Sequence, residues 1–378
     1  MRIGLTCTTI EPCLAQGKLD GIGTYTKNLL ASFQTKGKTI VPFSFPNNTI
    51  KNNSELNNGQ FFKYSYSVST IISLMNPLPF SLYTNLKNKI DILHATDHML
   101  PKINNIPVVA TICDAIMFNN ANWHWDTIKL GNLKKWMRKK TLHWADHYIT
   151  ISHAMVPELV EFIGIDPKKI SVVYLGIDPS WFHLQDELAK QAVLKKLNLP
   201  NQFILAAGTI QHKKNLPRLI HAFLELPEDI QEAYPLVIVG KSGWGIEESM
   251  AAIKMLTDKK RGVWLDYVEF ADLQILFQAA SLYAHPSLHE GFGLTVLEAF
   301  ASNTPVLTSN VKALPEIASN AAYLIDPYSI NDITRGLHTI LTSPSLQQEL
   351  VQKGLERARA FSWEKCATDT LKIYESVI

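Results

Sequence analysis

The sequence lacks several features that mark other classes of protein. Its 378 residues contain no run of about 18 apolar residues, which excludes an ordinary membrane-spanning helix. Lys and Arg number 36 against 34 Asp and Glu, a net charge of only +2, whereas nucleic-acid-binding proteins usually carry a marked basic excess. We therefore expect neither a transmembrane helix nor a nucleic-acid partner.

Cysteine is scarce and shows no regular spacing. Cys7, Cys13, Cys113 and Cys366 form no Cys-x-x-Cys pair, and sparse cysteine in a long chain favours a reducing compartment. The first residues, MRIGLTC, turn polar after a few positions and predict a strand and not a signal peptide. We expect a cytoplasmic protein.

Common nucleotide and metal motifs are also missing. No Gly-x-x-x-x-Gly-Lys-Ser/Thr sequence occurs, which excludes a P-loop NTPase. Gly21 and Gly23 precede a helical pattern, but Thr26 replaces the third glycine of the dinucleotide fingerprint and no suitably placed acid follows, so an oxidoreductase is disfavoured. The 12 histidines show no metal-ligand spacing. For three of these histidines, namely His94, His98 and His124, the two interpretations are a place at the border of a cleft and a purely structural role.

Short apolar segments alternate with helical patterns along the whole chain. RIGLTC, PVVATIC, FILAAG and LVIVG each end in a polar or small residue, and stretches of helical period separate many such segments. Buried strands that alternate with helices indicate doubly wound parallel sheets. The pattern occurs once in each half, and a glycine and a proline in YLGIDPSWFH (174–183) favour a boundary near Ile177. A cleft between the two domains is then the expected ligand site.

A basic pair follows the strand FILAA. Lys213 and Lys214 lie in the predicted strand-to-helix loop of GTIQHKKNLPRL, with Asn215 as the predicted N-cap and Pro217 in the first helical turn. Because cations at a helix N-terminus oppose the helix dipole, a bound polyanion would account for them. An exposed lysine pair is the alternative.

Two glutamates flank a glycine turn in PSLHEGFGLTVLEAFASNTPV (286–306). Glu290 lies in the loop after a predicted strand, while Thr295 and Glu298 share one face of the following helix. Carboxylates accept hydrogen bonds from hydroxyls but repel a polyphosphate, so ribose and sugar hydroxyls are the expected partners. A solvated surface helix is the alternative. The opposite helix face is predicted to be buried and comprises Val296, Leu297 and Phe300.

These motifs together resemble the family-four glycosyltransferases, retaining enzymes of the GT-B fold. PSLHEGFGLTVLEAF is similar to the family's E-x7-E signature, and GIGTYTKNLL, GTIQHKKNLPRLIHAF, LVIVGKSGW and FSWEKCATDTLKIY follow the family's order. The resemblance implies two Rossmann-like domains facing a central cleft. They are an acceptor-side domain (1–176) and a donor-binding domain (177–360), with a C-terminal helix (361–378) packing back on the first.

The resemblance also implies roles for individual residues. Glu290 would contact donor-sugar hydroxyls, Glu298 the ribose, and Lys214 the phosphates. Thr209 stands where the family often has arginine, so Lys213 is expected to supply that charge. The expected catalytic residues are Glu290, Lys214 and Asp114. The expected donor-binding residues are Gly21, Gly23, Gly208, Thr209, Lys213, Lys214, Gly240, Glu290, Gly291, Phe292, Gly293, Leu294, Thr295 and Glu298.

The function implied is transfer of a hexose, with retention, to a glycan or lipid-linked saccharide. The variants GTIQHKKN and GKSGW resemble bacterial surface-polysaccharide mannosyltransferases, so GDP-mannose is the first donor expected, and a GDP- or UDP-sugar serves as substrate and not as cofactor. No Asp-x-Asp occurs, and we expect no metal. Cys113 replaces a frequent family histidine before Asp114, which leaves that role open. The alternatives are a GT-B nucleotide-sugar epimerase and a non-catalytic sugar-nucleotide-binding subunit.

A basic, aromatic stretch occupies residues 129–144. It has six Lys or Arg between 129 and 140, no acid in that span, and Trp136 and Trp144. Such a stretch either contacts the inner face of an anionic membrane peripherally or forms a solvated helix that packs its apolar side.

Overall fold

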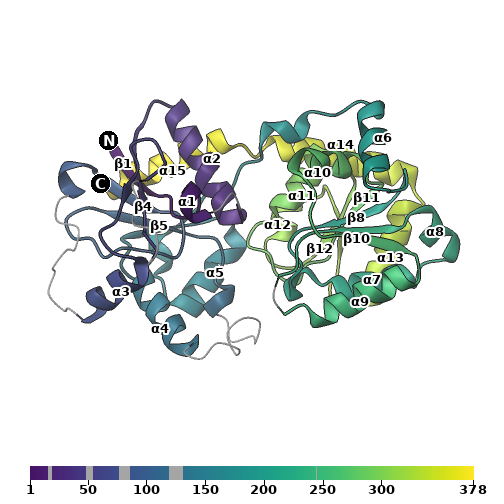
Figure 1. The fold of residues 1–378 in the computed structure, drawn as a ribbon, viewed down its shortest axis with the longest axis horizontal. Coiled ribbons are helices and arrows are strands. Elements are labelled where there is room, and N and C mark those ends of the chain that lie inside the picture. The colour runs from purple at the N-terminus through teal and green to yellow at the C-terminus, as the bar shows by residue number, and fades with distance from the viewer. Residues whose placement is uncertain (16–18, 48–53, 76–85, 119–130, 244) are drawn as a thin grey trace. The chain divides into compact units, whose positions relative to one another are not determined.

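The computed structural model describes residues 1–378 except 16–18, 48–53, 76–85, 119–130 and 244. The chain divides into two compact units. The first contains Met1–Gly176 together with Trp363–Ile378, and the second contains Ile177–Ser362. Each unit is a parallel sheet with helices on both faces (Figure 1), so the predicted α/β class with two doubly wound domains is confirmed.

The first unit holds a seven-stranded sheet of order β3-β2-β1-β4-β5-β6-β7. Its strands are β1 (Arg2–Thr6), β2 (Thr39–Ser44), β3 (Gln60–Phe61), β4 (Ile92–Ala95), β5 (Val108–Ile112), β6 (His147–Thr150) and β7 (Ile170–Val172). Its helices are α1 (Pro12–Ala15), α2 (Gly21–Thr35), α3 (Tyr66–Met75), α4 (Gly131–Leu142), α5 (Val156–Glu158) and α15 (Trp363–Val377). Short helical turns are η1 (Leu86–Asn88), η2 (Ile116–Phe118), η3 (His153–Met155), η4 (Leu159–Ile163) and η5 (Pro167–Lys169).

The central strands of this sheet are buried on both faces, which explains their unbroken apolar runs. All five residues of β5 and all four of β4 are buried. Helices α2 and α15 pack against each other on one face, while α4 and α5 lie on the other (Figure 1). The last helix is therefore part of the first unit.

The second unit holds a six-stranded parallel sheet of order β10-β9-β8-β11-β12-β13. Its strands are β8 (Ile204–Ala207), β9 (Leu236–Val239), β10 (Gly262–Leu265), β11 (Leu282–His285), β12 (Val306–Ser309) and β13 (Tyr323–Ile325). Its helices are α6 (Glu187–Lys196), α7 (Leu216–Leu224), α8 (Glu228–Ala233), α9 (Glu247–Asp258), α10 (Phe270–Ala279), α11 (Leu294–Ala301), α12 (Leu314–Ala318), α13 (Ile330–Leu341) and α14 (Pro344–Arg359), with short turns η6 (Pro179–Phe182) and η7 (His212–Lys214).

Helices cover both faces of the second sheet. Helices α7, α9 and α13 pack together on one face, and α10, α11 and α14 lie on the other (Figure 1). Helix α7 buries Leu216, Leu219, Ile220 and Phe223, which recur at the three- and four-residue spacing of one helical face. These side chains join the core formed with β8, β9 and β11.

The strand order of each sheet reverses at one point. In the first sheet the reversal lies between β1 and β4, and in the second between β8 and β11. At such a switch point, the loops that leave the two neighbouring strands diverge and open a crevice at the carboxyl ends. The topology therefore predicts one ligand site per sheet, made by the loops after β1 and β4 and by the loops after β8 and β11.

Candidate active site

The loops after β8 and β11 bring the predicted lysines and Glu290 together. Lys214 Nζ lies 2.7 Å from Glu290 Oε1, and Lys213 Nζ lies 3.9 Å from Oε2. Between 12% and 18% of each of these three side chains is exposed, so water screens the pairs less than it would at the surface. Lys213 and Lys214 are therefore not the exposed pair of the alternative interpretation.

Asn215 connects the two loops through hydrogen bonds. Its side-chain amide donates to the carbonyl oxygens of Pro286 (3.0 Å) and Pro327 (2.7 Å), and Arg218 donates to its Oδ1. In addition, the Leu288 N–H donates to the Lys213 carbonyl. Asn215 stands at the N-cap position of α7 as predicted, but the side-chain capping bond expected of an N-cap asparagine is not formed. With φ of 60° its side chain makes no capping bond and is used for loop-to-loop contact.

His285, the last residue of β11, completes the cluster. Its Nε2 lies 3.3 Å from Glu290 Oε1 and its Nδ1 lies 3.0 Å from the Tyr283 hydroxyl. Burial and the nearby Lys214 lower the pKa of His285, so the imidazole is neutral at pH 7. Because a nitrogen that faces a carboxylate must carry a proton, we assign the proton to Nε2. Nδ1 is then an acceptor beside the Tyr283 hydroxyl, whose single proton it shares with the Ala207 carbonyl oxygen 3.2 Å from that hydroxyl.

The electrostatics of the two glutamates differ sharply. Burial by itself would raise the pKa of Glu290, but attraction to Lys214 and Lys213, with the His285 hydrogen bond, holds it well below its usual range. Burial raises the pKa of Glu298 to about 7, with Lys214 opposing and Asp178 adding to the shift. Glu290 is thus a permanent carboxylate, whereas Glu298 is half protonated near neutral pH.

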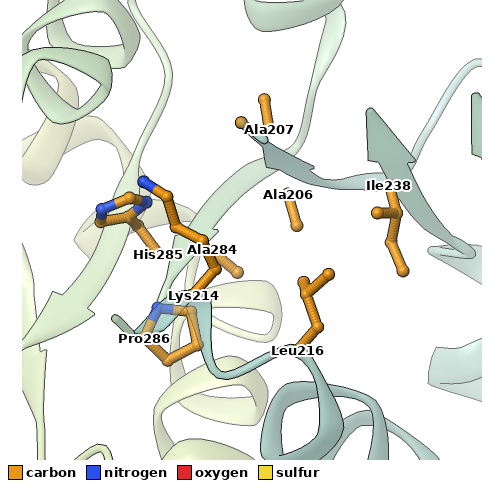
Figure 2. A pocket seen from close by; sticks show the side chains of 9 residues that line it. Ala206, Ala207, Lys214, Leu216, Ile238, Ala284, His285 and Pro286 are labelled. Carbon is orange, nitrogen blue, oxygen red and sulfur yellow. The ribbon is translucent and has the colours of Figure 1, made fainter. Parts of the chain in front are cut away.

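A small cavity lies beside Lys214 under the end of β8. It measures about 20 Å³, enough for one water molecule, and apolar side chains make up most of its wall. Figure 2 shows the Lys214 side chain running alongside the His285 ring at one end, while Ala206, Leu216 and Ile238 line the other. The lysine stem is buried against this wall, which directs the ammonium group toward the loops.

Two glycines allow the backbone to approach closely here. A Cβ on Gly240, whose φ is +153°, would lie 2.0 Å from the Gly208 carbonyl oxygen. The N–H groups of Gly208 and Gly240 donate to Val239 and Leu265, so they hold the loops to the sheet. Thr209 follows Gly208 in the same loop.

The glycine turn after Glu290 leads directly into α11. Gly293 has φ of +108° and stands at the N-cap position, and α11 begins at Leu294. Gly291 and Phe292 are buried, and the Phe292 ring packs on Phe361. As predicted, Val296, Leu297 and Phe300 are buried, while Thr295 and Glu298 share the less buried face. The alternative of a solvated surface helix is wrong.

The remaining predicted residues lie in the first unit. Gly21 and Gly23 open α2, and the Gly23 N–H donates to the Asp20 carboxylate, which caps the helix. Asp114 follows β5 and accepts from the Ile116 N–H. Cys113 beside it has a pKa raised by burial and by Asp114, which makes it a poor nucleophile.

The histidines divide as follows. His94 is a structural residue, since it is fully buried and its two nitrogens contact the Tyr374 hydroxyl (2.5 Å) and Thr111 Oγ1 (2.7 Å). His124 lies outside the described residues. His285 was not among the candidates, and its position at the carboxyl end of a strand, five residues before Glu290, is the signal that could have found it.

Comparison with known proteins is consistent with this geometry. The family model for "Glycosyltransferase Family 4" matches residues 19–181, and that for "Glycosyl transferases group 1" matches residues 190–357. The two matches thus fall on successive parts of the chain, one almost wholly in each unit.

Two curated relatives and one solved structure illustrate the similarity. O-antigen chain mannosyltransferase B of Escherichia coli is 35% identical over 184 residues, 48% of each chain. Serotype-specific mannosyltransferase WbdA of Escherichia coli is 30% identical over 230 residues, 59% of this chain and 28% of that protein. The chain therefore spans about half the length of the first relative, and less of the second.

The structure of HepE from Anabaena in complex with UDP has the same fold. It superposes with a TM-score of 0.71 over 100% of both chains at 15% identity. The two family matches adjoin along the chain, each unit has a doubly wound sheet, and Glu290 of the E-x7-E motif lies against the lysine pair. The chain therefore belongs to the family-four glycosyltransferases of the GT-B fold.

Proposed function

We propose that this protein transfers a hexose, with retention of configuration, from a nucleotide-diphosphate sugar to a glycan or lipid-linked saccharide. The observation that carries the proposal is the cluster of Lys213, Lys214 and Glu290 at the switch point of the second sheet. It combines two cations for a diphosphate with a permanent carboxylate for sugar hydroxyls.

The lysines act on the leaving group. Breaking the bond between the sugar and the phosphate develops negative charge on the diphosphate. A cation about 4 Å from that charge stabilises it by about 4 kcal/mol at an effective dielectric constant of about 20. Lys214 and Lys213, with the N-terminus of α11, supply this stabilisation from fixed positions, and we propose that no metal ion is required.

Glu290 positions groups and does not transfer protons. Its depressed pKa keeps it ionised, so it accepts hydrogen bonds from sugar hydroxyls and holds Lys214 in place. Glu298, one turn into α11, binds ribose hydroxyls and can donate or accept because its pKa is about 7. The roles that the resemblance implies for Gly21, Gly23 and Asp114 of the first unit stay predictions.

The acceptor hydroxyl attacks the face from which the phosphate departs, and the departing phosphate takes the hydroxyl proton. The new glycosidic bond forms as the bond between sugar and phosphate breaks. The buried, neutral His285 keeps Glu290 in place and is not the base. No protein base is needed in this scheme.

GDP-mannose is the proposed donor. Two of the relatives are named as mannosyltransferases, and the solved neighbour was crystallised with UDP, which supports a nucleoside-diphosphate donor.

The test is incubation with GDP-mannose and UDP-glucose in the presence of methyl α-D-mannopyranoside, followed by proton NMR of the product. We expect an α-linked disaccharide, the same yield with EDTA, and a preference for GDP-mannose. Release of an altered free sugar without acceptor would indicate an epimerase, and nucleotide-sugar binding without turnover would indicate a non-catalytic subunit.

Peripheral membrane contact through α4 is a second part of the proposal. Trp136 is 51% exposed, and Lys139 and Lys140 are exposed on the same helix. Residues 129 and 130 of the predicted stretch lie outside the described residues. In the part of the chain that the structure describes, no helix is long and apolar enough to cross a bilayer. A lipid-linked acceptor would give such contact a purpose.

A further inference from the structure

Asp97 and His98 lie at the switch point of the first sheet. They follow β4 closely, where the strand order reverses between β1 and β4. Both are buried, with 5% and 8% of their surfaces exposed. Ligands of open parallel sheets bind beyond the carboxyl ends of the strands at this position.

Each of the two side chains has a buried polar atom that lacks a hydrogen-bond partner among the described residues. Asp97 Oδ1 accepts from the Met99 N–H at 2.8 Å, but Oδ2 has no partner. His98 Nδ1 also has none. Because buried polar groups are nearly always hydrogen-bonded in folded proteins, two such atoms on consecutive residues indicate that a ligand supplies the missing partners.

The surrounding residues hold this loop in place. The Tyr66 hydroxyl of α3 donates to the His98 carbonyl at 3.3 Å and lies 2.9 Å from Thr141 Oγ1 of α4. The His98 ring packs against Phe118 with centroids 6.4 Å apart. The two unsatisfied atoms therefore belong to a fixed loop, as expected for a preorganised site.

The charge of the surroundings distinguishes between ligands. Burial raises the pKa of Asp97 to about 7, with Asp20 adding to the shift and Arg138 opposing it. Burial lowers the pKa of His98, and the nearby carboxylate of Asp114 opposes this shift. Among the described residues, the carboxyl groups of Asp20 and Asp114 and the guanidinium of Arg138 thus act on this pair, which contributes the carboxyl group of Asp97 itself. Such a field disfavours a diphosphate, whereas neutral hydroxyls can both donate to a carboxylate and bond to an imidazole.

We propose that Asp97 and His98 bind hydroxyl groups of the acceptor saccharide, Asp97 through Oδ2 and His98 through Nδ1. This inference rests on the proposed function, and it adds two binding residues, of which the sequence had indicated only His98, as a histidine that either borders a cleft or is structural. The donor binds to residues of the second unit and the acceptor to residues of the first, so the two substrates have separate sets of polar contacts.

The test measures binding of methyl glycosides of mannose, glucose and galactose by NMR titration, without donor, and binding of GDP by calorimetry. Asp97→Asn keeps the acceptor for the Met99 N–H and changes only Oδ2. His98→Gln removes the group at Nδ1, whereas His98→Asn places an amide near it. Asp146→Asn is the matched control, because Asp146 accepts from the Val108 N–H at the amino end of β5.

We expect Asp97→Asn and His98→Gln to weaken binding of the preferred glycoside by about tenfold or more, and His98→Asn by less. Asp146→Asn should leave glycoside affinity unchanged. Asp97→Asn should not lower the melting temperature, because it removes a buried, unsatisfied charge, whereas a purely structural role would lower it.

Equal glycoside affinity in wild type, Asp97→Asn and His98→Gln would overturn the proposal, as would the absence of glycoside binding to the wild-type protein. Failure of the wild-type protein to bind GDP would instead contradict the proposed function, and the glycoside titration would still decide the role of this pair.

Discussion

The side chain of Glu290 is largely buried, and its carboxylate is stabilised in the ionised form by neighbouring lysines. Its carboxylate contacts Lys214, Lys213 and His285. A buried carboxylate that loses its partners is strongly destabilising, so the lysines stabilise the site before any ligand binds. A diphosphate that also binds Lys214 weakens the attraction between this lysine and Glu290, and sugar hydroxyls can then donate further hydrogen bonds to the carboxylate. The ion pair therefore couples recognition of the phosphate to recognition of the sugar.

Glu298 gives a prediction at the same scale, based on its raised pKa. The folded protein keeps this proton up to about pH 7, while the unfolded chain releases it near 4.5. Between these values the folded state binds more protons, so the free energy of unfolding falls as pH rises. Glu298→Gln removes this titration, and its stability relative to wild type should increase from pH 4.5 to pH 7.

Urea denaturation at several pH values measures this difference. The exposed Glu248→Gln serves as control, because it makes the same chemical change at the surface. A difference for Glu298→Gln that does not change with pH would contradict the assigned environment of the carboxyl group.

At the scale of elements, Asn215 holds the loop that carries the lysines to the loop that carries Glu290. Asn215→Ala should lower the free energy of unfolding by about 2–3 kcal/mol, because two buried carbonyls lose their donor. Asn215→Gly loses the same bonds but tolerates φ of 60°, so it should be more stable than the alanine variant by about 1 kcal/mol. Chemical denaturation compares the two. If alanine and glycine were equally stable, the backbone conformation would not matter.

Helix α4 gives a second prediction at this scale. Trp136→Ala, with Lys139 and Lys140 changed to Gln, should reduce sedimentation with vesicles rich in anionic lipid, and added salt should reduce wild-type binding. Helix α9 offers a control, because Lys254 is exposed and pairs with Asp258. Equal sedimentation of wild type and the α4 variant would support the solvated-helix interpretation.

Local patterns were sufficient to predict most elements of the second unit. The period of Val296, Leu297 and Phe300 predicted the buried face of α11, and the apolar runs predicted β8, β9 and β11. The ion pair was not predictable from spacing alone, because Lys214 and Glu290 are 76 residues apart and meet only where β8 pairs with β11. That pairing skips two strands, so it depends on the topology of the whole sheet.

Single residues in the first unit were harder to interpret. His94 and His98 are four residues apart, yet one has both nitrogens bonded and the other has an unsatisfied Nδ1. The difference comes from Tyr374, which α15 brings back to the sheet from the end of the chain. No local pattern contains that information.

At the scale of the molecule, the chain builds two sheets with a switch point each. Lys213, Lys214 and Glu290 occupy one, and Asp97 and His98 occupy the other. The switch point of the second sheet has two lysines and one carboxylate, whereas that of the first sheet has the carboxyl groups of Asp20, Asp97 and Asp114 and one guanidinium, that of Arg138. This division suits a transfer reaction in which one substrate is a polyanion and the other is a polyol.

Turnover of GDP-mannose by Lys214→Ala tests the central claim most directly. Release of GDP in the presence of methyl α-D-mannopyranoside should fall at least about 100-fold relative to wild type, because an interaction of about 3 kcal/mol with the leaving diphosphate is lost. Lys254→Ala, which removes an exposed ion pair, should stay within about twofold of wild type. Wild-type turnover by Lys214→Ala would contradict the account.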